Sequence, residues 1–481
     1  MLYHFFNPTL KMGYHRFLTL VVRKNATRTR NQKPMNILLI SPKYNSHIIA
    51  PHLGLGYLSA SLKKAGHTVL VLDGLREPVV YDPDKWDLVG VTAMSTYFPE
   101  ALAEVKKAHS LGLKTIIGGP HVISVPEQSL KDSGADYACL GEGEITLNQL
   151  ASGIPAEEVE GLLYREDGEI KQSSPKHFHK NIDEFGFPDW SSIDPRTYPL
   201  APHGMIARAH PLAPIITTRG CPYPCTYCSA PITAGKAMRY RDPISVVDEI
   251  EMLIRDFGVK EIQIEDDNFT VKRSHTQEIC EEILRRNIKV LWSLPNGVRI
   301  DLLDPELLRL MKRSGCYLMA LGIESANQRI LDLVKKQLDK EVVRKTVREV
   351  TDAGIEAWGF FMVGFPTETR EEIQNTIDFA HSLPLTLAQF TKCTPLPGTE
   401  IYDLWLKDYS DGKHIDWATF NYYKFHSNWA EVTSDEIDSM QKKAHLRFYA
   451  NPKNFIHIIK NLRFRQYMTA FKRLFNLSTA D

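Results

Sequence analysis

Three of the seven cysteines lie within eight residues, and their type and spacing are suited to metal chemistry. Cys221, Cys225 and Cys228 have the spacing C-x3-C-x2-C and follow the apolar run 214–216 closely. Such a run is typical of a short buried strand, and Gly220 with two prolines predicts an irregular loop after it. Sulfurs on one loop can converge on a soft metal, so we expect these three thiolates to be metal ligands.

The other four cysteines give no second cluster of ligands. They stand singly in apolar or helical segments, where a free cysteine packs as a small hydrophobic residue; they are Cys139, Cys280, Cys316 and Cys393. A closed structural zinc site needs four ligands, usually as two separated pairs. Three ligands without a fourth favour an iron–sulfur cluster with one open iron, and a structural zinc loop is the alternative.

The loop C-x3-C-x-aromatic-C after a first strand resembles that of the radical S-adenosylmethionine (SAM) enzymes. In that family the three cysteines bind three irons of a [4Fe–4S] cluster, and SAM chelates the fourth iron. The resemblance implies that the reduced cluster cleaves SAM to a 5′-deoxyadenosyl radical. It also places Tyr227, at the family's aromatic position, beside the adenine.

Composition restricts the class of protein further. The chain has 481 residues, enough for two or three domains, and a formal net charge of zero, so no overall basic field attracts nucleic acid. An odd, clustered set of cysteines argues against a disulfide framework and for a reducing compartment, which predicts a cytoplasmic protein. No run of apolar residues approaches the length of a transmembrane helix.

Residues 35–160 alternate apolar strands with amphipathic helices. This pattern predicts an α/β domain with a doubly wound, Rossmann-like parallel sheet. The expected strands are 36–41, 68–73, 87–92, 114–118 and 135–140, and the expected helices are 54–65, 99–111 and 144–151. Ligands of such sheets bind beyond the carboxyl ends of the strands.

Glycine-rich loops follow several of these strands. Together with the cysteine loop, they resemble the N-terminal domain of the cobalamin (B12)-dependent radical SAM enzymes. The resemblance implies that cobalamin is bound by residues of these loops, namely Pro51, His52, Gly54, Gly118, Gly119, Gly141, Glu142 and Gly143. The Asp-x-His-x-x-Gly signature of cobalamin mutases is absent, so we expect cobalamin without a protein histidine on cobalt.

Residues 161–212 are expected to form a hairpin and then a linker that packs across two domains. From residue 213 to residue 400, strand and helix alternate again at the spacing of βα units, which predicts a partial (β/α)6 barrel. The expected strands are 214–217, 261–265, 290–294, 318–322, 357–363 and 388–392. Active sites of parallel barrels lie at the carboxyl ends of the strands.

Polar residues stand at those ends and resemble the SAM contacts of the family. The resemblance implies contacts from Asp266, Asp267, Arg299, Glu324, Ser325 and Gly364. The two aspartates would bond the methionine ammonium or the ribose, and the alternative for them is an Asx turn that starts a helix. Arg299 would pair with a carboxylate, and Gly364 lies in the segment that lines the adenine.

The two ends of the chain have their own composition. Residues 1–34 are basic without any acidic residue, and a disordered extension is favoured over a targeting segment. Residues 401–481 are expected to form a helical substrate or cap region. Within it, residues 452–477 are basic and amphipathic, so they either cap the barrel or contact an anionic membrane surface.

The expected function is radical C-methylation of an unactivated carbon in a sizeable apolar or lipid-like substrate. The electron would come from an external donor such as flavodoxin or ferredoxin. Oxidative cyclisation, as in the anaerobic magnesium-protoporphyrin monomethyl ester cyclases, is the main alternative. A methylthiotransferase, a zinc module that contacts nucleic acid and a redox cluster protein without SAM are weaker alternatives.

Overall fold

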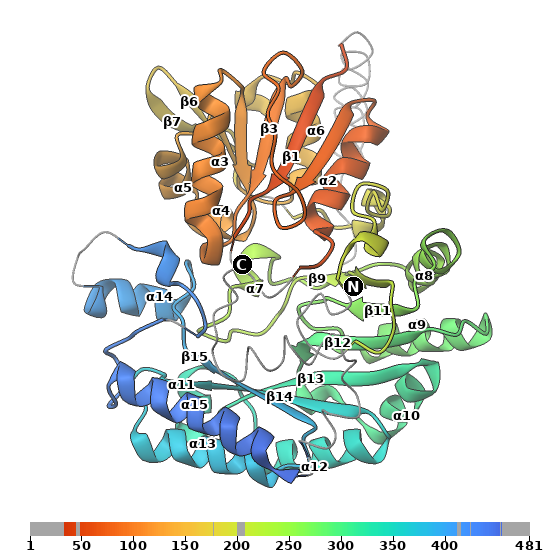
Figure 1. Ribbon diagram of the computed structural model, residues 1–481, viewed down its shortest axis with the longest axis vertical. Helices are drawn as coiled ribbons and strands as arrows, with labels where there is room; N and C mark the ends of the chain where they lie inside the picture. The colour runs from red at the N-terminus through yellow and green to blue at the C-terminus, as the bar shows by residue number, and fades with distance from the viewer. Residues whose placement is uncertain are drawn as a thin grey trace, which may run out of the picture.

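The protein has two α/β bodies, each built on its own sheet, with the cysteine-containing segment between them (Figure 1). The computed structural model describes residues 33–44, 49–176, 178–199, 207–410, 415–423, 425–452 and 454. The predicted extension 1–34 and the basic stretch 452–477 therefore lie almost entirely outside the described residues.

The first sheet has seven strands in the order β2-β1-β3-β4-β5-β6-β7, of which the first five run parallel. The strands are β1 (Asn36–Ser41), β2 (Thr68–Asp73), β3 (Leu88–Thr92), β4 (Thr115–Gly118), β5 (Tyr137–Cys139), β6 (Leu162–Glu166) and β7 (Glu169–Gln172). The helices are α2 (Leu53–Lys64), α3 (Phe98–Ser110), α4 (Pro120–Ser124), α5 (Pro126–Ser133) and α6 (Gly143–Ala151). All of these elements except α4 and α5 were predicted from the sequence.

Alternate residues of β1 are buried in two different cores. Ile37 and Leu39 belong to the core that includes residues of α2, whereas Leu38 and Ile40 belong to the core that includes residues of α3. Successive side chains of a strand point to opposite faces, so helices cover both faces of this sheet. The predicted doubly wound architecture is confirmed.

The hairpin β6–β7 extends this sheet. Sequence reasoning grouped it with the linker, but β6 pairs antiparallel with β5, with Tyr137 opposite Tyr164. The pairing covers the edge of β5, which would otherwise present unpaired backbone groups. A hairpin's own pattern does not reveal which distant strand it will join.

The second sheet has six parallel strands in the order β15-β14-β13-β12-β11-β8, and β8 and β15 form its open edges. The strands are β8 (Leu212–Ile215), β11 (Glu261–Ile264), β12 (Leu291–Val298), β13 (Cys316–Glu324), β14 (Glu356–Val363) and β15 (Leu387–Lys392). The helices are α8 (Pro243–Phe257), α9 (Arg273–Arg285), α10 (Pro305–Ser314), α11 (Gln328–Leu333), α12 (Lys340–Asp352) and α13 (Arg370–Ser382). The predicted partial barrel is confirmed.

Capping residues fix the ends of the barrel helices. Asp242 and Asp304 accept hydrogen bonds from the first backbone amides of α8 and α10. Both helices end at a glycine in the left-handed conformation, Gly258 and Gly315. These are the residue types that satisfy the free backbone groups at the two ends of a helix.

The linker packs across both bodies, as predicted. The Asp189 carboxylate accepts hydrogen bonds from Ser59 Oγ (2.7 Å) and Lys63 Nζ (2.6 Å) of α2. The next residue, Trp190, donates its indole N–H to Glu249 of α8 at 2.9 Å. Neighbouring residues of the linker thus contact the first sheet's helices and the barrel.

The described C-terminal region adds contacts to both bodies. Its short turn η8 (Trp417–Thr419) packs against α3, and its helix α15 (Ser434–Ala450) packs against α13 and β15. A capping box between Thr433 and Glu436 starts α15. Within the described residues, none of the helices combines the length and the apolar character needed to cross a membrane.

Gly119 lies between β4 and α4, where the backbone packs tightly at the carboxyl edge of the first sheet. Its φ is +101°, and an added Cβ would lie 2.7 Å from the Ala93 carbonyl oxygen. We expect Gly119→Ala to lower the free energy of unfolding of this domain by about 3 kcal/mol. Denaturant unfolding followed by circular dichroism measures the loss.

The matched control is Gly112→Ala, because Gly112 has φ +77° but no atom within 4 Å of the added Cβ. In this control, only the left-handed backbone conformation disfavours alanine, so the free energy of unfolding should fall by about 1 kcal/mol. Equal losses in the two variants would contradict the close backbone approach at Gly119.

Candidate active site

The three cysteines lie on the loop between the short strand β9 (Thr218–Arg219) and the helical turn α7 (Ala230–Thr233). All three thiols are free; Cys221 is buried and the other two are partly exposed. Gly220 has φ +102°, and a Cβ there would lie 2.5 Å from the Ala237 carbonyl oxygen. Only glycine therefore allows the chain to enter the cysteine loop in this conformation.

The three sulfurs lie close enough to influence one another's ionisation. Burial, together with negative charge on Cys221 and Cys225, raises the pKa of Cys228 to about 12. Burial also raises the pKa of Cys221, with a further increase from the carboxylate of Asp267. Thiolates gathered in this way need positive charge beside them, which a [4Fe–4S] cluster supplies, so the donor set fits the predicted cluster.

Asp266 bonds the strand that leads into the cysteine loop. Its side chain is buried and accepts hydrogen bonds from the Thr217 backbone N–H (2.6 Å), the Thr217 hydroxyl (2.5 Å) and the Thr218 backbone N–H (3.1 Å). Burial raises its pKa to about 6, although these donors lower it. Asp266 thus holds residues 217 and 218, which lead into the cysteine loop. The side chain of Asp267, in contrast, is exposed.

Glu324 ends β13 with its backbone in the left-handed region, at φ +66°. Its carboxylate pairs with the buried ammonium of Lys336 at 2.9 Å. Lys336 Nζ also lies 3.4 Å from the hydroxyl of Tyr227 in the cysteine loop. The residue that the sequence placed at SAM is therefore joined to a cation and to the aromatic residue of the cysteine loop.

Arg299 has protein partners around its guanidinium. It binds the Asp301 carboxylate with two nitrogens, both at 2.9 Å, and donates to the backbone carbonyls of Lys336 (2.9 Å) and Gln337 (3.0 Å). It also lies over the ring of Tyr223, 4.0 Å from the centroid. These contacts give Arg299 a role in holding the segment that carries Lys336, and its predicted contact with a carboxylate of SAM stays a prediction.

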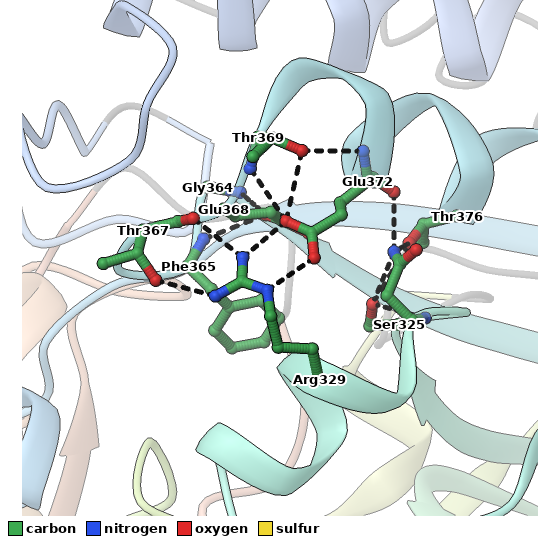
Figure 2. Close-up of polar contacts among 10 residues, drawn as sticks. Ser325, Arg329, Gly364, Phe365, Thr367, Glu368, Thr369, Glu372 and Thr376 are labelled. Atoms are coloured by element: carbon green, nitrogen blue, oxygen red, sulfur yellow. Dashed lines mark hydrogen bonds and ion pairs between the residues drawn. The ribbon is translucent and has the colours of Figure 1, made fainter.

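Gly364 lies in a tight turn after β14, and the turn is held by a carboxylate (Figure 2). Glu368 is fully buried, and one of its oxygens accepts the backbone N–H groups of Gly364 (2.7 Å) and Phe365 (3.0 Å). From the other side, the indole of Trp429 donates to the Gly364 carbonyl at 2.7 Å. The ring of Phe365 then packs edge-on against Tyr227, with centroids 6.0 Å apart.

Arg329 of α11 secures the same turn. Figure 2 shows its guanidinium between the Thr367 carbonyl (2.8 Å) and the Glu372 carboxylate (2.7 and 2.5 Å). Glu372 closes a capping box with Thr369 at the start of α13. Ser325, which the sequence placed at SAM, is buried beside this network, with its hydroxyl 3.2 Å from that of Thr376.

Glu368 gives the protein a pH-dependent stability. Burial raises the pKa of Glu368 to about 8, so the folded protein keeps a proton that the unfolded chain releases near its usual pKa. Stability from this group is complete at low pH and is lost as the pH rises toward 8, by up to about 1.4 kcal/mol per pH unit. As the pH rises from the usual pKa of a glutamate toward 8, we expect the thermal midpoint of the wild type to fall relative to that of Glu368→Gln. A difference that does not change with pH would contradict the raised pKa.

On the side of the first sheet, the predicted glycines and their neighbours lie on loops at its carboxyl edge. His52 caps α2 by accepting the Leu55 backbone N–H at 3.3 Å, and it stands between Pro51 and the exposed Gly54. Gly118 and Gly119 link β4 to α4, which packs against α7 just after the cysteine loop. The predicted cobalamin loops and the cysteine loop are therefore neighbours.

His121 is buried at this edge. Its ring stacks on Phe98 (centroids 3.9 Å apart), lies edge-on to Trp417 (4.5 Å), and contacts the Ser95 hydroxyl at 2.9 Å. Burial lowers its pKa to about 3, so the imidazole is neutral. The side chain is only 1% exposed. His121 therefore serves to pack the first body against the C-terminal region.

Gly141, Glu142 and Gly143 follow β5, and Glu142 reaches across to the barrel. Its carboxylate pairs with Arg219 (2.9 Å) and Arg239 (2.6 Å), which lie on the paired strands β9 and β10 (Arg239–Tyr240). Burial raises the pKa of Glu142, but the charges and hydrogen bonds of the two arginines together outweigh burial and hold the pKa below its usual value. Neither arginine was singled out from the sequence, nor were Lys336 and Glu368. Of these four residues, only Arg219 had a signal in the sequence, because it stands two residues before Cys221, the first of the predicted ligands.

An α/β sheet with glycine-rich loops at its carboxyl edge, set against a partial barrel with a three-cysteine loop, is the architecture of a B12-binding radical SAM enzyme. The chain belongs to this family. Residues 215–380 match the Radical SAM superfamily, and residues 45–151 match the B12 binding domain.

Individual relatives agree with this assignment. An uncharacterised methyltransferase of Pyrococcus horikoshii is 31% identical over 452 residues, which cover 88% of this chain and 94% of the relative. The anaerobic magnesium-protoporphyrin IX monomethyl ester cyclase of Rubrivivax gelatinosus is 29% identical over 392 residues, covering 76% of this chain and 69% of the relative. The radical SAM methyltransferase TsrM of Kitasatospora setae, solved with cobalamin and a [4Fe–4S] cluster, shares the fold with a TM-score of 0.64 and 22% identity, over 77% of this chain and 74% of that one.

The cofactors follow from the family. This protein is a radical SAM enzyme with a [4Fe–4S] cluster, SAM and cobalamin as cofactors. The residues that would hold the cluster are the three cysteines of the loop. Within the described part of the chain, no three or more His, Cys, Asp or Glu side chains are arranged to hold a single metal ion.

Proposed function

We propose that this protein is a cobalamin-dependent radical SAM methyltransferase that methylates an unactivated carbon of a sizeable apolar or lipid-like molecule. One observation carries the proposal: the carboxyl edge of the first sheet meets the cysteine loop at the mouth of the barrel. There α4 packs against α7, and Glu144 of the first body pairs with Arg219 of the barrel at 2.7 Å. A methyl donor and a hydrogen-abstracting centre held at these two edges would share one substrate.

When bound, the cluster with SAM supplies a carbon-centred radical, and cobalamin supplies the methyl group. The protein's own residues bind and orient these groups. Glu324 and Lys336 offer a carboxylate and an ammonium side by side, which complement the ammonium and the carboxylate of the methionine part of SAM. Phe365 and Tyr227 offer two aromatic rings to the adenine. Glu324, Lys336 and Phe365 are buried, and their burial helps to exclude water from the reacting centre.

The C-terminal region supports an apolar substrate. Its aromatic side chains pack on one another in a single cluster, made by Trp405, Trp417, Phe420, Phe425 and Trp429. Beside the cluster, Tyr422 lies near Cys228, whose charge contributes, after burial, to raising the Tyr422 pKa to about 12. The backbone carbonyl of Tyr422 accepts the N–H of Lys392 at the end of β15, at 2.7 Å. Tyr422 is 38% exposed, so a large apolar molecule that binds over its ring would lie near the cysteine loop.

The proposal extends to the partners and the compartment of the protein. Free thiols, all seven of them, suit a reducing compartment such as the cytoplasm. The cluster would be reduced by an external protein such as flavodoxin or ferredoxin. For residues 452–477, we propose peripheral contact with an anionic membrane surface, since a lipid-like substrate would be reached there.

Oxidative cyclisation is the second candidate function. The observation that favours it is the relative in Rubrivivax gelatinosus, a magnesium-protoporphyrin IX monomethyl ester cyclase that matches over 76% of this chain. Both candidates use the same three cofactors, so their products distinguish them.

The experiment uses protein reconstituted without oxygen with iron, sulfide and hydroxocobalamin, then reduced in the presence of SAM labelled in its methyl group. Extracts of lipids and porphyrins serve as substrates. Methylation predicts the label in an extractable product. Reduction of SAM to 5′-deoxyadenosine, together with an unlabelled product that has lost hydrogen, would favour cyclisation instead.

A further inference from the structure

Two glutamates of the first body and two arginines of the barrel form one buried group of charges, which we call the interdomain clamp: Glu142, Glu144, Arg219 and Arg239. Glu142 pairs with Arg219 at 2.9 Å and with Arg239 at 2.6 Å, and Glu144 pairs with Arg219 at 2.7 Å. Their side chains are between 6% and 15% exposed. Opposite charges that are this well buried are held together because each would be costly to leave alone.

The sequence assigned Glu142 to cobalamin, but its carboxylate is already satisfied by protein groups. One oxygen accepts from both arginines, and the other accepts the backbone N–H of His179 in the linker at 2.6 Å. A carboxylate with all these donors needs no ligand to balance it. The loop's two glycines remain free to approach a ligand, whereas the side chain between them points to the barrel.

Aromatic rings enclose the arginines of the clamp. The Arg219 guanidinium lies 5.0 Å from the ring centroids of both Tyr57 and Phe185, and that of Arg239 lies 5.3 Å from the centroid of Phe178. Tyr57 belongs to α2, and the two phenylalanines belong to the linker. Residues of two separate segments therefore fix the direction of the two cations.

The clamp lies next to both cofactor loops along the chain. Arg219 pairs with Arg239 in the β9–β10 ladder and is followed by Gly220 and Cys221, so a shift of Arg219 moves the first ligand cysteine. Glu142 stands between Gly141 and Gly143 at the start of α6, so the same shift moves the loop predicted to approach cobalamin. The clamp therefore links the two loops directly, through the ion pairs of Glu142 and Glu144 with Arg219.

We propose that Glu142 and Glu144 are positioning residues that fix the loop 141–144 against the strand leading into the cysteine loop, so that the two cofactor sites keep one spacing. The proposal rests on the proposed function, because it assigns the spacing to methyl transfer between the two sites. It assigns to Glu142 a role in joining the two bodies instead of a contact with cobalamin.

The test compares full-length wild type with Glu142→Gln, which keeps the size of the side chain and removes its charge. The protein is reconstituted with iron, sulfide and hydroxocobalamin. Three quantities are measured: bound corrinoid per chain, amide hydrogen exchange of residues 216–228 and 141–147, and the distance distribution between cob(II)alamin and the reduced cluster by pulsed electron paramagnetic resonance. Hydrogen exchange is also measured without cobalamin.

We expect Glu142→Gln to bind as much corrinoid as the wild type, while exchange in both segments accelerates at least about tenfold and the distance distribution broadens. Glu144→Gln removes one contact of the clamp and should give a smaller change in the same direction; it replaces Glu142→Gln if that variant fails to fold. The matched control is Glu166→Gln, whose exposed pair with Lys171 lies in the same sheet and should leave all three quantities unchanged.

Loss of corrinoid without a change in exchange of residues 216–228 would overturn the proposal and return Glu142 to cobalamin. Unchanged exchange and distances in both glutamate variants would overturn it as well. Failure of the proposed function gives a different result, because the wild type itself would then bind no corrinoid. Hydrogen exchange without cobalamin would still show whether residues 216–228 and 141–147 depend on the clamp.

Discussion

Cys225→Ala is expected to abolish iron binding and SAM cleavage together. Cys225 is the central cysteine of the loop, and the three sulfurs of this loop are the ligands that the protein would supply to the cluster. Iron after reconstitution should fall from about four atoms per chain to less than about one. Formation of 5′-deoxyadenosine should fall at least about 100-fold, because SAM is cleaved only at the cluster. Iron analysis and chromatography of the SAM products measure the two effects.

Cys280→Ala provides the control for this variant. Cys280 is a buried free cysteine of α9, outside the loop, and burial raises its pKa to about 12. Its replacement should cost a little stability through lost packing and leave iron and SAM cleavage intact. A Cys225→Ala protein that keeps four irons and cleaves SAM would contradict the assignment of the cluster to this loop.

Lys336→Met is expected to weaken SAM binding at least about 30-fold and to destabilise the barrel. The change leaves the Glu324 carboxylate buried without its 2.9 Å partner, which lowers stability. It also removes the ammonium proposed to pair with the carboxylate of SAM. Truncating one member of a buried charge pair between protein and ligand costs about 2–5 kcal/mol in binding, and each 1.4 kcal/mol corresponds to roughly tenfold in affinity. Calorimetric titration of SAM into the reconstituted protein measures the affinity, and thermal unfolding measures the stability.

The neighbouring lysine offers a matched control. Lys335 is 47% exposed and pairs with Glu400, which is 60% exposed, so its pair is screened by solvent. Lys335→Met should change neither the affinity for SAM nor the unfolding midpoint appreciably. If both lysine variants bound SAM as the wild type does, Lys336 would have no part in the SAM site.

Most of the parallel strands could be predicted because their residues are apolar on both faces. In β1, Ile37 to Ile40 are at most 1% exposed, and a run of this kind between turn residues is the pattern of a strand inside a covered sheet. The helices α4 and α5 escaped prediction because they are short and follow one another with only Val125 between them. Their patterns are too brief to show a helical period.

Site residues could be predicted where their signal is local in the sequence, and were missed where it depends on a distant partner. The cysteines were found because all three ligands lie on one loop, so that their spacing is visible in the sequence. The clamp was missed because Glu142 and Arg219 are 77 residues apart, and nothing local to either residue indicates a partner. Lys336 was missed because it lies between α11 and α12, in a segment without periodicity, although the Glu324 it pairs with had been predicted.

The most direct test of the two-cofactor enzyme is a single anaerobic assay. The chain is produced with cobalamin supplied, reconstituted with iron and sulfide, and reduced with dithionite in the presence of SAM, and bound corrinoid and 5′-deoxyadenosine are measured in the same sample. A B12-binding radical SAM enzyme predicts both, with corrinoid near one per chain. The absence of both corrinoid and 5′-deoxyadenosine, in a protein that holds its iron, would contradict the central claim.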